Sequence, residues 1–190
     1  MNSTAEKLLA ADSTRFHFAR LGMQYYVMGR AAALHHQMPI LGNLLHHAVE
    51  FTLKAALAYQ VDIEAMRKKL SHHLPKIWDK FLTLNPHLDG TEHAGSIERL
   101  HGFEELRYPD SMVEKGGMIQ FAMFRHEVGW MPGGNTCNRG PRYLLVLEDV
   151  DALMAFIFKA AGLKQAGNLE INTPEVRELL TKNNRHWPKN

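Results

Sequence analysis

Residues 43–58 carry the clearest pattern of apolar and polar positions in the chain. On a helix that turns about 100° per residue, apolar side chains fill one broad face of this segment. A narrow polar stripe lies opposite and consists of His46, His47, Glu50 and Lys54. The pattern predicts a core helix with one polar stripe. Two interpretations of the stripe stay open, a solvated outer face of a helical bundle or the lining of a groove.

Helical periodicity also extends to both sides of this segment. Ser13 or Thr14 can cap a helix that runs to His36, after a short helical lead-in from Ser3. Pro39 suits the entry into the helix that follows. Further helices are predicted at 61–70, 71–84, 96–106 and 148–162, and a short one at 173–182.

Two β-prone runs interrupt the helical pattern late in the chain. Residues 117–124 and 143–147 are apolar, and the Gly- and Pro-rich stretch WMPGGNTCNRGPR lies between them. This arrangement predicts a small β-hairpin with a long loop, inserted at about 117–147.

Length and composition are those of an ordinary globular domain. The chain has 190 residues, of which 45% are hydrophobic and 22% charged, so residues 1–190 are expected to form one domain. The predicted fold class is mainly α, four-helix-bundle-like, with additional short helices and the hairpin insertion. Its helical core would span about 13–110 and 148–162.

Charge and cysteine content narrow the classes of function. The formal net charge of +2 leaves no strong overall footprint for nucleic acid, so any such contact must come from local patches. Cys137 is the single cysteine, which excludes an intrachain disulfide and any multi-cysteine metal site. The first residues lack the apolar core of a signal peptide, and nowhere do 18 apolar residues run together. A cytoplasmic protein without a membrane segment is therefore expected.

Three motifs occur in order, LLHHAVEFTLKAAL, SHHLPKIWDKF and EELRYPD. Together with the long helix before them, they resemble the HEPN superfamily from about Phe16 to Asp110. The resemblance implies a four-helix bundle that is often dimeric. It also implies a metal-independent endoribonuclease, a toxin with a nucleotidyltransferase partner, or a noncatalytic binding module. By the same resemblance, His46, Glu50 and Lys54 would face the groove that holds the active or binding site.

The ribonuclease members of this family carry an Arg, then four to six residues and a His, on the last helix of the bundle. Residues 149–161 contain neither residue type. The spacing does occur at Arg30 with His35 or His36 and at Arg67 with His72 or His73, about as often as chance predicts.

Candidate catalytic groups come from the polar stripe and from one turn. His46 or His47 can serve as an acid–base group and Lys54 as a cation for phosphate, if the histidines do not simply face solvent. Arg107 can bind a phosphate through two hydrogen bonds, or can bind Asp110 or the last carbonyls of its own helix.

A second set of candidates flanks the Gly-rich loop. Arg125, His126, Arg139 and Arg142 are placed to hold an anion there, unless they are solvated charges at a hairpin tip. Trp130 can stack on a base or pack against a partner.

No metal site or cofactor is expected from the sequence. Adjacent histidines occur at 35–36, 46–47 and 72–73, but neighbours on a helix point about 100° apart and do not usually share one ion. Cys137 lacks a recognisable catalytic partner.

The preferred functional hypothesis is a HEPN-like binding or regulatory module for RNA, a nucleotide or a partner protein. Such a module would belong to a toxin–antitoxin or defence pair. The ligand-binding residues would be His46, Glu50 and Lys54, with Arg125, His126, Arg139 and Arg142 as the second set. Two alternatives stay open, a metal-independent endoribonuclease toxin and a structural protein whose role is to form a homodimer.

Overall fold

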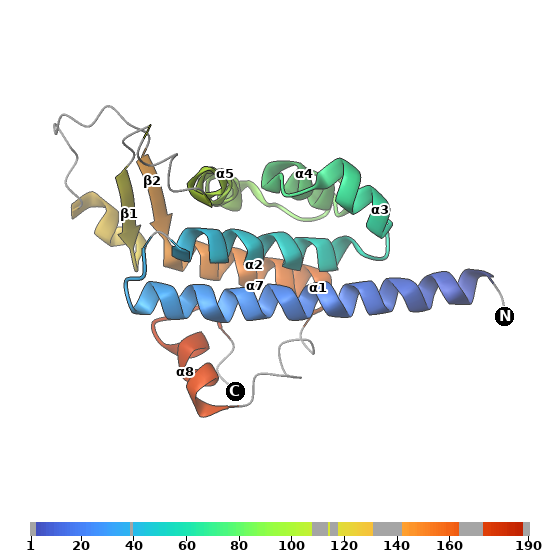
Figure 1. Cartoon of the computed structure of the whole chain (residues 1–190), viewed down its shortest axis with the longest axis horizontal. Coiled ribbons are helices and arrows are strands. Elements are labelled where there is room, and N and C mark those ends of the chain that lie inside the picture. Colours follow the sequence, from blue (N-terminus) through green and yellow to red (C-terminus); the bar gives the residue numbers. More distant parts are fainter. Residues whose placement is uncertain are drawn as a thin grey trace.

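The structure is a computed structural model and describes residues 3–38, 40–107, 114, 118–130, 142–163 and 173–187. Within these residues the chain is mainly helical, as predicted (Figure 1). The α-helices are α1 (Ser3–Leu34), α2 (Ile40–Leu57), α3 (Ile63–Ala65), α4 (Leu74–Leu84), α5 (Ala94–Gly102), α7 (Leu147–Ala161) and α8 (Pro174–Thr181). Shorter turns are the π-helix η1 (Met66–Leu70) and the 3₁₀-helices η2 (Thr91–His93), η3 (Phe103–Arg107) and η4 (Arg125–Trp130).

Helices α1 and α2 form a long antiparallel pair (Figure 1). Helix α1 is continuous from Ser3, so the predicted start at Ser13 or Thr14 is wrong. Two glycines of α1 let the helices approach closely. A Cβ on Gly22 would lie 2.5 Å from Thr52 Oγ1, and a Cβ on Gly29 would lie 2.5 Å from Leu45 Cδ2.

Helix α2 is the centre of the fold, because it packs against α1, α4, α5 and α7 (Figure 1). Most of its apolar face is buried, as Leu45, Val49 and Leu53 illustrate. Helices α4 and α5 lie above α2 in Figure 1. The stripe faces this side, because His46 contacts Leu100 of α5 and Lys54 contacts Ser71, which follows η1.

Several helix boundaries follow from local chemistry. Pro75 lies in the first turn of α4, where its missing N–H costs no hydrogen bond. Gly162 ends α7 in the left-handed conformation, with φ of 62°. Thr173 caps α8 through its side chain. These three signals were all readable in the sequence.

The two strands do not form the predicted hairpin. Strands β1 (Met118–Ala122) and β2 (Arg142–Val146) pair in parallel, with Met118 opposite Arg142 and Ala122 opposite Val146. Both arrows therefore point the same way in Figure 1. Parallel strands need a crossover of a dozen or more residues, and the connection from 123 to 141 is long enough to provide it. Among the described helices, none has the length and apolar character needed to cross a membrane.

Candidate functional site

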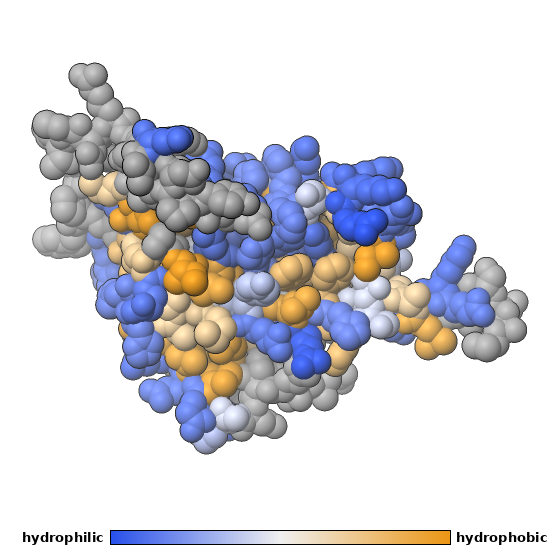
Figure 2. Space-filling model, viewed as in Figure 1, coloured by the Kyte–Doolittle hydropathy of each residue, from blue (hydrophilic) through white to orange (hydrophobic). Residues whose placement is uncertain are grey.

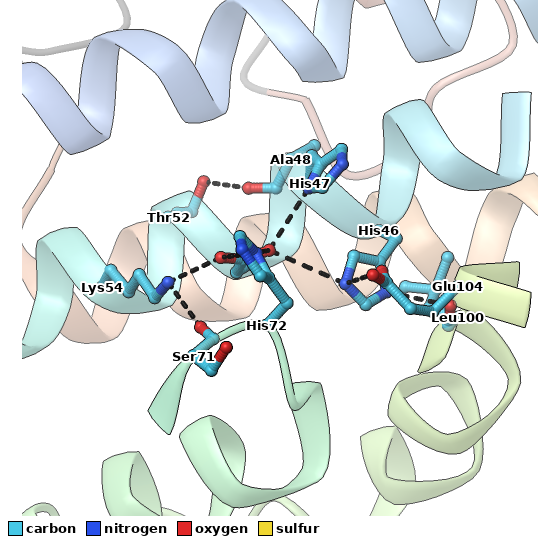
Figure 3. Close-up of polar contacts among 10 residues, drawn as sticks. His46, His47, Ala48, Thr52, Lys54, Ser71, His72, Leu100 and Glu104 are labelled. Carbon is cyan, nitrogen blue, oxygen red and sulfur yellow. Dashed lines mark hydrogen bonds and ion pairs between the residues drawn. The ribbon is translucent and has the colours of Figure 1, made fainter. Parts of the chain in front are cut away.

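The polar stripe of α2 is buried, so its interpretation as a solvated face is wrong. His46 and Glu50 are 0% exposed and Lys54 is 5% exposed. Two segments cover the stripe, the turn that follows η1 and the start of η3 (Figure 3). They add His72 and Glu104 to the stripe residues. These side chains, His46, His47, Glu50, Lys54, His72 and Glu104, are called the histidine–carboxylate cluster below.

Glu50 is the centre of this cluster. Its Oε1 accepts hydrogen bonds from Lys54 Nζ at 2.6 Å and from His72 Nδ1 at 3.0 Å. Its Oε2 lies 3.2 Å from His47 Nδ1. Burial alone would raise the pKa of Glu50, but hydrogen bonds from His47, Lys54 and His72 outweigh it and lower the pKa to about 2. Glu50 is therefore a charged carboxylate at neutral pH.

Lys54 is committed to holding this arrangement together. Besides Glu50, its ammonium group donates to the carbonyl oxygen of Ser71 at 2.6 Å. Ser71 ends the π-helix η1 with φ of 48°, a conformation that is uncommon outside glycine. Lys54 thus fixes a strained turn over Glu50 and is not presented at the surface as a phosphate-binding cation.

His46 has one nitrogen matched and one unmatched. Its Nδ1 lies 3.1 Å from the carbonyl oxygen of Leu100, which only accepts, so Nδ1 carries a proton. Burial lowers the pKa of His46 below its ordinary value, so the ring is neutral at pH 7. Nε2 then carries a lone pair. Within the described part of the chain, Nε2 makes no hydrogen bond.

The cluster reaches solvent through two histidines. The side chain of His72 is 49% exposed and that of His47 is 17% exposed. The His47 ring packs against Tyr25 of α1 and Phe51 of α2, with ring centroids 5.2 Å and 5.9 Å away. These contacts orient His47 toward Glu50.

The second set of candidate residues does not join this cluster. Arg125 forms an ion pair with Asp149 of α7, and its backbone N–H donates to Glu148. His126 is exposed and stacks on Phe124. The side chains of Arg107, Trp130 and Arg142, and all of Arg139 and Cys137, lie outside the described residues.

Sequence reasoning missed the partners that come from outside α2. His72 was noted for its spacing from Arg67 and as one of an adjacent histidine pair, but not as a partner of Glu50. Glu104 and the carbonyl groups of Ser71 and Leu100 were not singled out. The motif order gave a partial signal, because SHHLP and EELRYPD contain His72 and Glu104. Backbone carbonyl groups leave no such signal in a sequence.

A cavity of ≈ 430 Å³ lies apart from the cluster, between α4 and α5. Trp78 and Leu82 form part of its wall, and Asp79, Asp89 and Glu98 surround them. Because the charged groups of this lining are carboxylates, the cavity does not suit the phosphates of a nucleic acid.

No family model, curated protein or solved structure matches the chain. Function is therefore inferred from the geometry of the cluster. The cluster offers a charged carboxylate, a buried neutral imidazole and two imidazoles that reach solvent. Such groups can transfer protons, orient a phosphate at the rim or bind a cation.

Proposed function

We propose that the protein is a HEPN-like RNA-binding module whose binding surface lies over the histidine–carboxylate cluster. The observation that carries this proposal is an exposed run of cations next to the cluster. Arg67, Lys68 and Lys69 belong to η1, directly before Ser71 and His72. Figure 2 shows strongly hydrophilic residues over this end of the bundle. The order of the three sequence motifs also supports the proposal.

Charge inside the cluster decides how RNA would lie on it. Glu50 is a buried anion, and Glu104 lies beside His46, so phosphates are repelled from the interior. Cations at the rim attract phosphates instead, and an exposed histidine ring can stack on an unpaired base. The expected contacts are Arg67 and Lys69 with phosphate and His72 with a base.

Retention of single-stranded RNA in excess chelator tests this proposal. The Arg67→Ala/Lys69→Ala variant should bind RNA at least tenfold more weakly. It should also reduce the slope of log K against log salt, by about 0.7 for each lost phosphate contact. Lys182→Ala is the matched control, because this exposed lysine follows α8, away from η1 (Figure 1). Equal retention by the three proteins, or no retention, would contradict RNA binding at this surface.

A metal-independent endoribonuclease is the second candidate. The specific observation is the pairing of half-exposed His72 with Glu50, since a histidine oriented by a carboxylate is a common general base. Arg67 precedes His72 with four residues between them, a spacing that chance alone also produces and that carries no weight here. The other match, at Arg30, is a fully buried ion pair with Asp151 and has no access to RNA.

Cleavage in chelator separates the two candidates. A ribonuclease would cut RNA without metal, and His72→Ala would abolish cutting while leaving most of the RNA retention. The control is His126→Ala, which removes an exposed histidine that stacks on Phe124, away from the cluster. This variant should cut RNA at the normal rate. Retention without cutting by the unmodified protein supports the binding module alone.

The resemblance further supports a homodimer and a nucleotidyltransferase partner. Helix α1 extends beyond the rest of the bundle and exposes apolar side chains there (Figures 1 and 2). Leu8 is 56% exposed and Leu9 61% exposed. We propose that a second copy of the chain covers them. Leu8→Glu/Leu9→Glu should then give a monomer in sedimentation velocity, and an unchanged sedimentation coefficient would contradict this interface.

The nucleotidyltransferase partner is a separate proposal. Co-purification with a co-expressed nucleotidyltransferase tests it.

A further inference from the structure

Three possible metal-ligand atoms in the histidine–carboxylate cluster lie close together. We propose that His46, His47 and Glu50 bind one divalent first-row transition metal ion, for which zinc is the reference. The three ligand atoms lie within 4.8 Å of one another. The proposal concerns metal binding by the chain itself and does not depend on RNA binding.

The spacing of these atoms matches the geometry of a zinc site. Zinc–nitrogen and zinc–oxygen bonds of about 2.0–2.2 Å in a tetrahedron place neighbouring ligand atoms about 3.3–3.6 Å apart. His46 Nε2 lies 3.7 Å from Glu50 Oε2, and His47 Nδ1 lies 3.2 Å from the same oxygen. All three atoms lie within 4.8 Å of one another, so side-chain rotation has to supply the remaining approach to tetrahedral spacing.

Both histidines reach Glu50 although they are neighbours on the helix. Glu50 lies four residues after His46 and three residues after His47, and both spacings place side chains on the same helix face. The two rings lean toward the carboxylate from either side, with centroids 5.4 Å apart. The expectation that adjacent histidines point apart therefore fails at this pair.

Electrostatics also favours a cation at this point. The lone pair of His46 Nε2 faces two carboxylate oxygens, Glu50 Oε2 at 3.7 Å and Glu104 Oε2 at 3.3 Å. An acceptor that faces acceptors in a buried site is unfavourable. A divalent ion turns these contacts into attractive ones, and it gives the buried His46 nitrogen a bond that the described residues do not supply.

Binding requires a change of protonation at His47 but not at Glu50 or His46. Glu50 is already ionised, and the Leu100 carbonyl already holds the His46 proton on Nδ1. That hydrogen bond is the outer contact that usually fixes the tautomer of a metal-binding histidine. His47 Nδ1 donates to Glu50 in the structure, so metal binding exchanges this hydrogen bond for a metal bond and moves the proton of the neutral ring to Nε2.

The neighbouring residues affect how tightly a metal ion would bind and how it would reach the site. Lys54 binds the other oxygen of Glu50, so it orients the carboxylate but also repels a metal ion. Glu104 adds negative charge beside His46. Half-exposed His72 lies at the opening and contacts both oxygens of Glu50, outside the group of three possible ligands. Two histidines and one carboxylate leave a fourth position open, as in catalytic zinc sites.

Metal titration without RNA tests the proposal. After treatment with chelator and its removal, zinc binding is followed by calorimetry, and cobalt binding by its visible absorption. One ion per chain should bind, and the cobalt spectrum should have the intensity of a four-coordinate site. His47→Ala and Glu50→Gln should each weaken zinc binding at least tenfold. His17→Ala, which removes an exposed histidine of α1, should bind like the unmodified protein.

The outcomes distinguish a specific metal site from nonspecific zinc binding by surface histidines. Weak zinc binding that all four proteins share, or no binding by the unmodified protein, would overturn the proposal. His47→Ala keeps the test valid if Glu50→Gln does not fold, which circular dichroism reveals. RNA retention is measured separately in chelator, so failure of the metal site and failure of RNA binding are independent results.

Discussion

The cluster around Arg30 and the cluster around Glu50 are both buried, but their polar atoms are matched to different degrees. Arg30 of α1 forms an ion pair with Asp151 of α7, and it also donates to the carbonyl groups of Leu179 and Lys182 at the end of α8. Tyr26 donates to the second oxygen of Asp151 at 2.6 Å. Every guanidinium nitrogen of Arg30 therefore has an acceptor.

The cluster around Glu50 ends instead on the unmatched His46 Nε2. A fully matched network ties elements together, and the Arg30 cluster joins α1, α7 and α8 in this way. In the Glu50 cluster, the acceptor His46 Nε2 faces the oxygens of two carboxylates, so this network is less suited to stabilising the fold. The contrast suggests that the Arg30 cluster serves stability and the Glu50 cluster serves binding.

The largest effect on stability is expected at the matched cluster. Arg30→Met leaves Asp151 as a buried carboxylate without its cation, which should lower the free energy of unfolding by about 3–5 kcal/mol. Urea denaturation followed by helical circular dichroism measures it. The control is Arg185→Met, because Arg185 is 68% exposed and pairs with Glu148 at the surface. A loss below about 1 kcal/mol for Arg30→Met would remove the distinction between the clusters.

The next largest effect is the acid sensitivity that Glu50 contributes. Its pKa is lowered from 4.5 to about 2 in the folded protein, so its stabilising contribution is complete above pH 4.5 and is lost as the pH falls toward 2. The full contribution of ionised Glu50 to the free energy of unfolding is on the order of 3 kcal/mol. The stability difference between the unmodified protein and Glu50→Gln should therefore shrink across this range. Glu64→Gln, at a carboxylate whose side chain is 64% exposed, should show little change, and equal behaviour of both variants would contradict the assignment.

A smaller loss is expected when Lys54 is replaced. Lys54→Met removes two hydrogen bonds from a charged donor and leaves the strained Ser71 carbonyl without its partner, which should cost about 1.5–3 kcal/mol. The Lys54→Met/Glu50→Gln double variant should lose less than the sum of the single variants, because the two groups interact directly. Additive losses in urea denaturation would show that they do not.

The smallest effect is expected at His46. His46→Leu loses one hydrogen bond to Leu100 but also removes the nitrogen that faces two carboxylates, so it should cost at most about 1.5 kcal/mol. The same variant should lose zinc binding. A loss as large as that of Arg30→Met would mean that His46 is a structural residue.

The helices were largely predictable from the sequence, because local periodicity and stop signals determine them. Pro75 and Gly162 mark boundaries that the structure confirms. The predicted helix start at Ser13 was wrong, because a residue type that can cap a helix can also lie inside a continuous one. The strand direction was not predictable, because an apolar run does not record which way its partner runs and the 123–141 connection is long enough for either arrangement.

The site was predicted only in part, for a related reason. The stripe residues His46, Glu50 and Lys54 follow from helical spacing, but spacing does not reveal which segments cover them. Burial by the turn at Ser71 and by η3 depends on long-range packing. That packing leaves Nε2 of His46 without a hydrogen bond among the described residues, and it brings His72 to Glu50, where its hydrogen bond helps to lower the Glu50 pKa.

The most direct test of the contrast between the two clusters is the protonation state of the His46 ring. Nitrogen NMR of ¹⁵N-histidine-labelled protein at pH 7 in chelator, with the signal assigned by its absence in His46→Leu, reports both ring nitrogens. The expected result is a neutral ring with the proton on Nδ1 and a lone pair on Nε2, whose signal shifts when zinc replaces the chelator. A doubly protonated ring, or an Nε2 signal that zinc leaves unchanged, would contradict a binding role for this cluster.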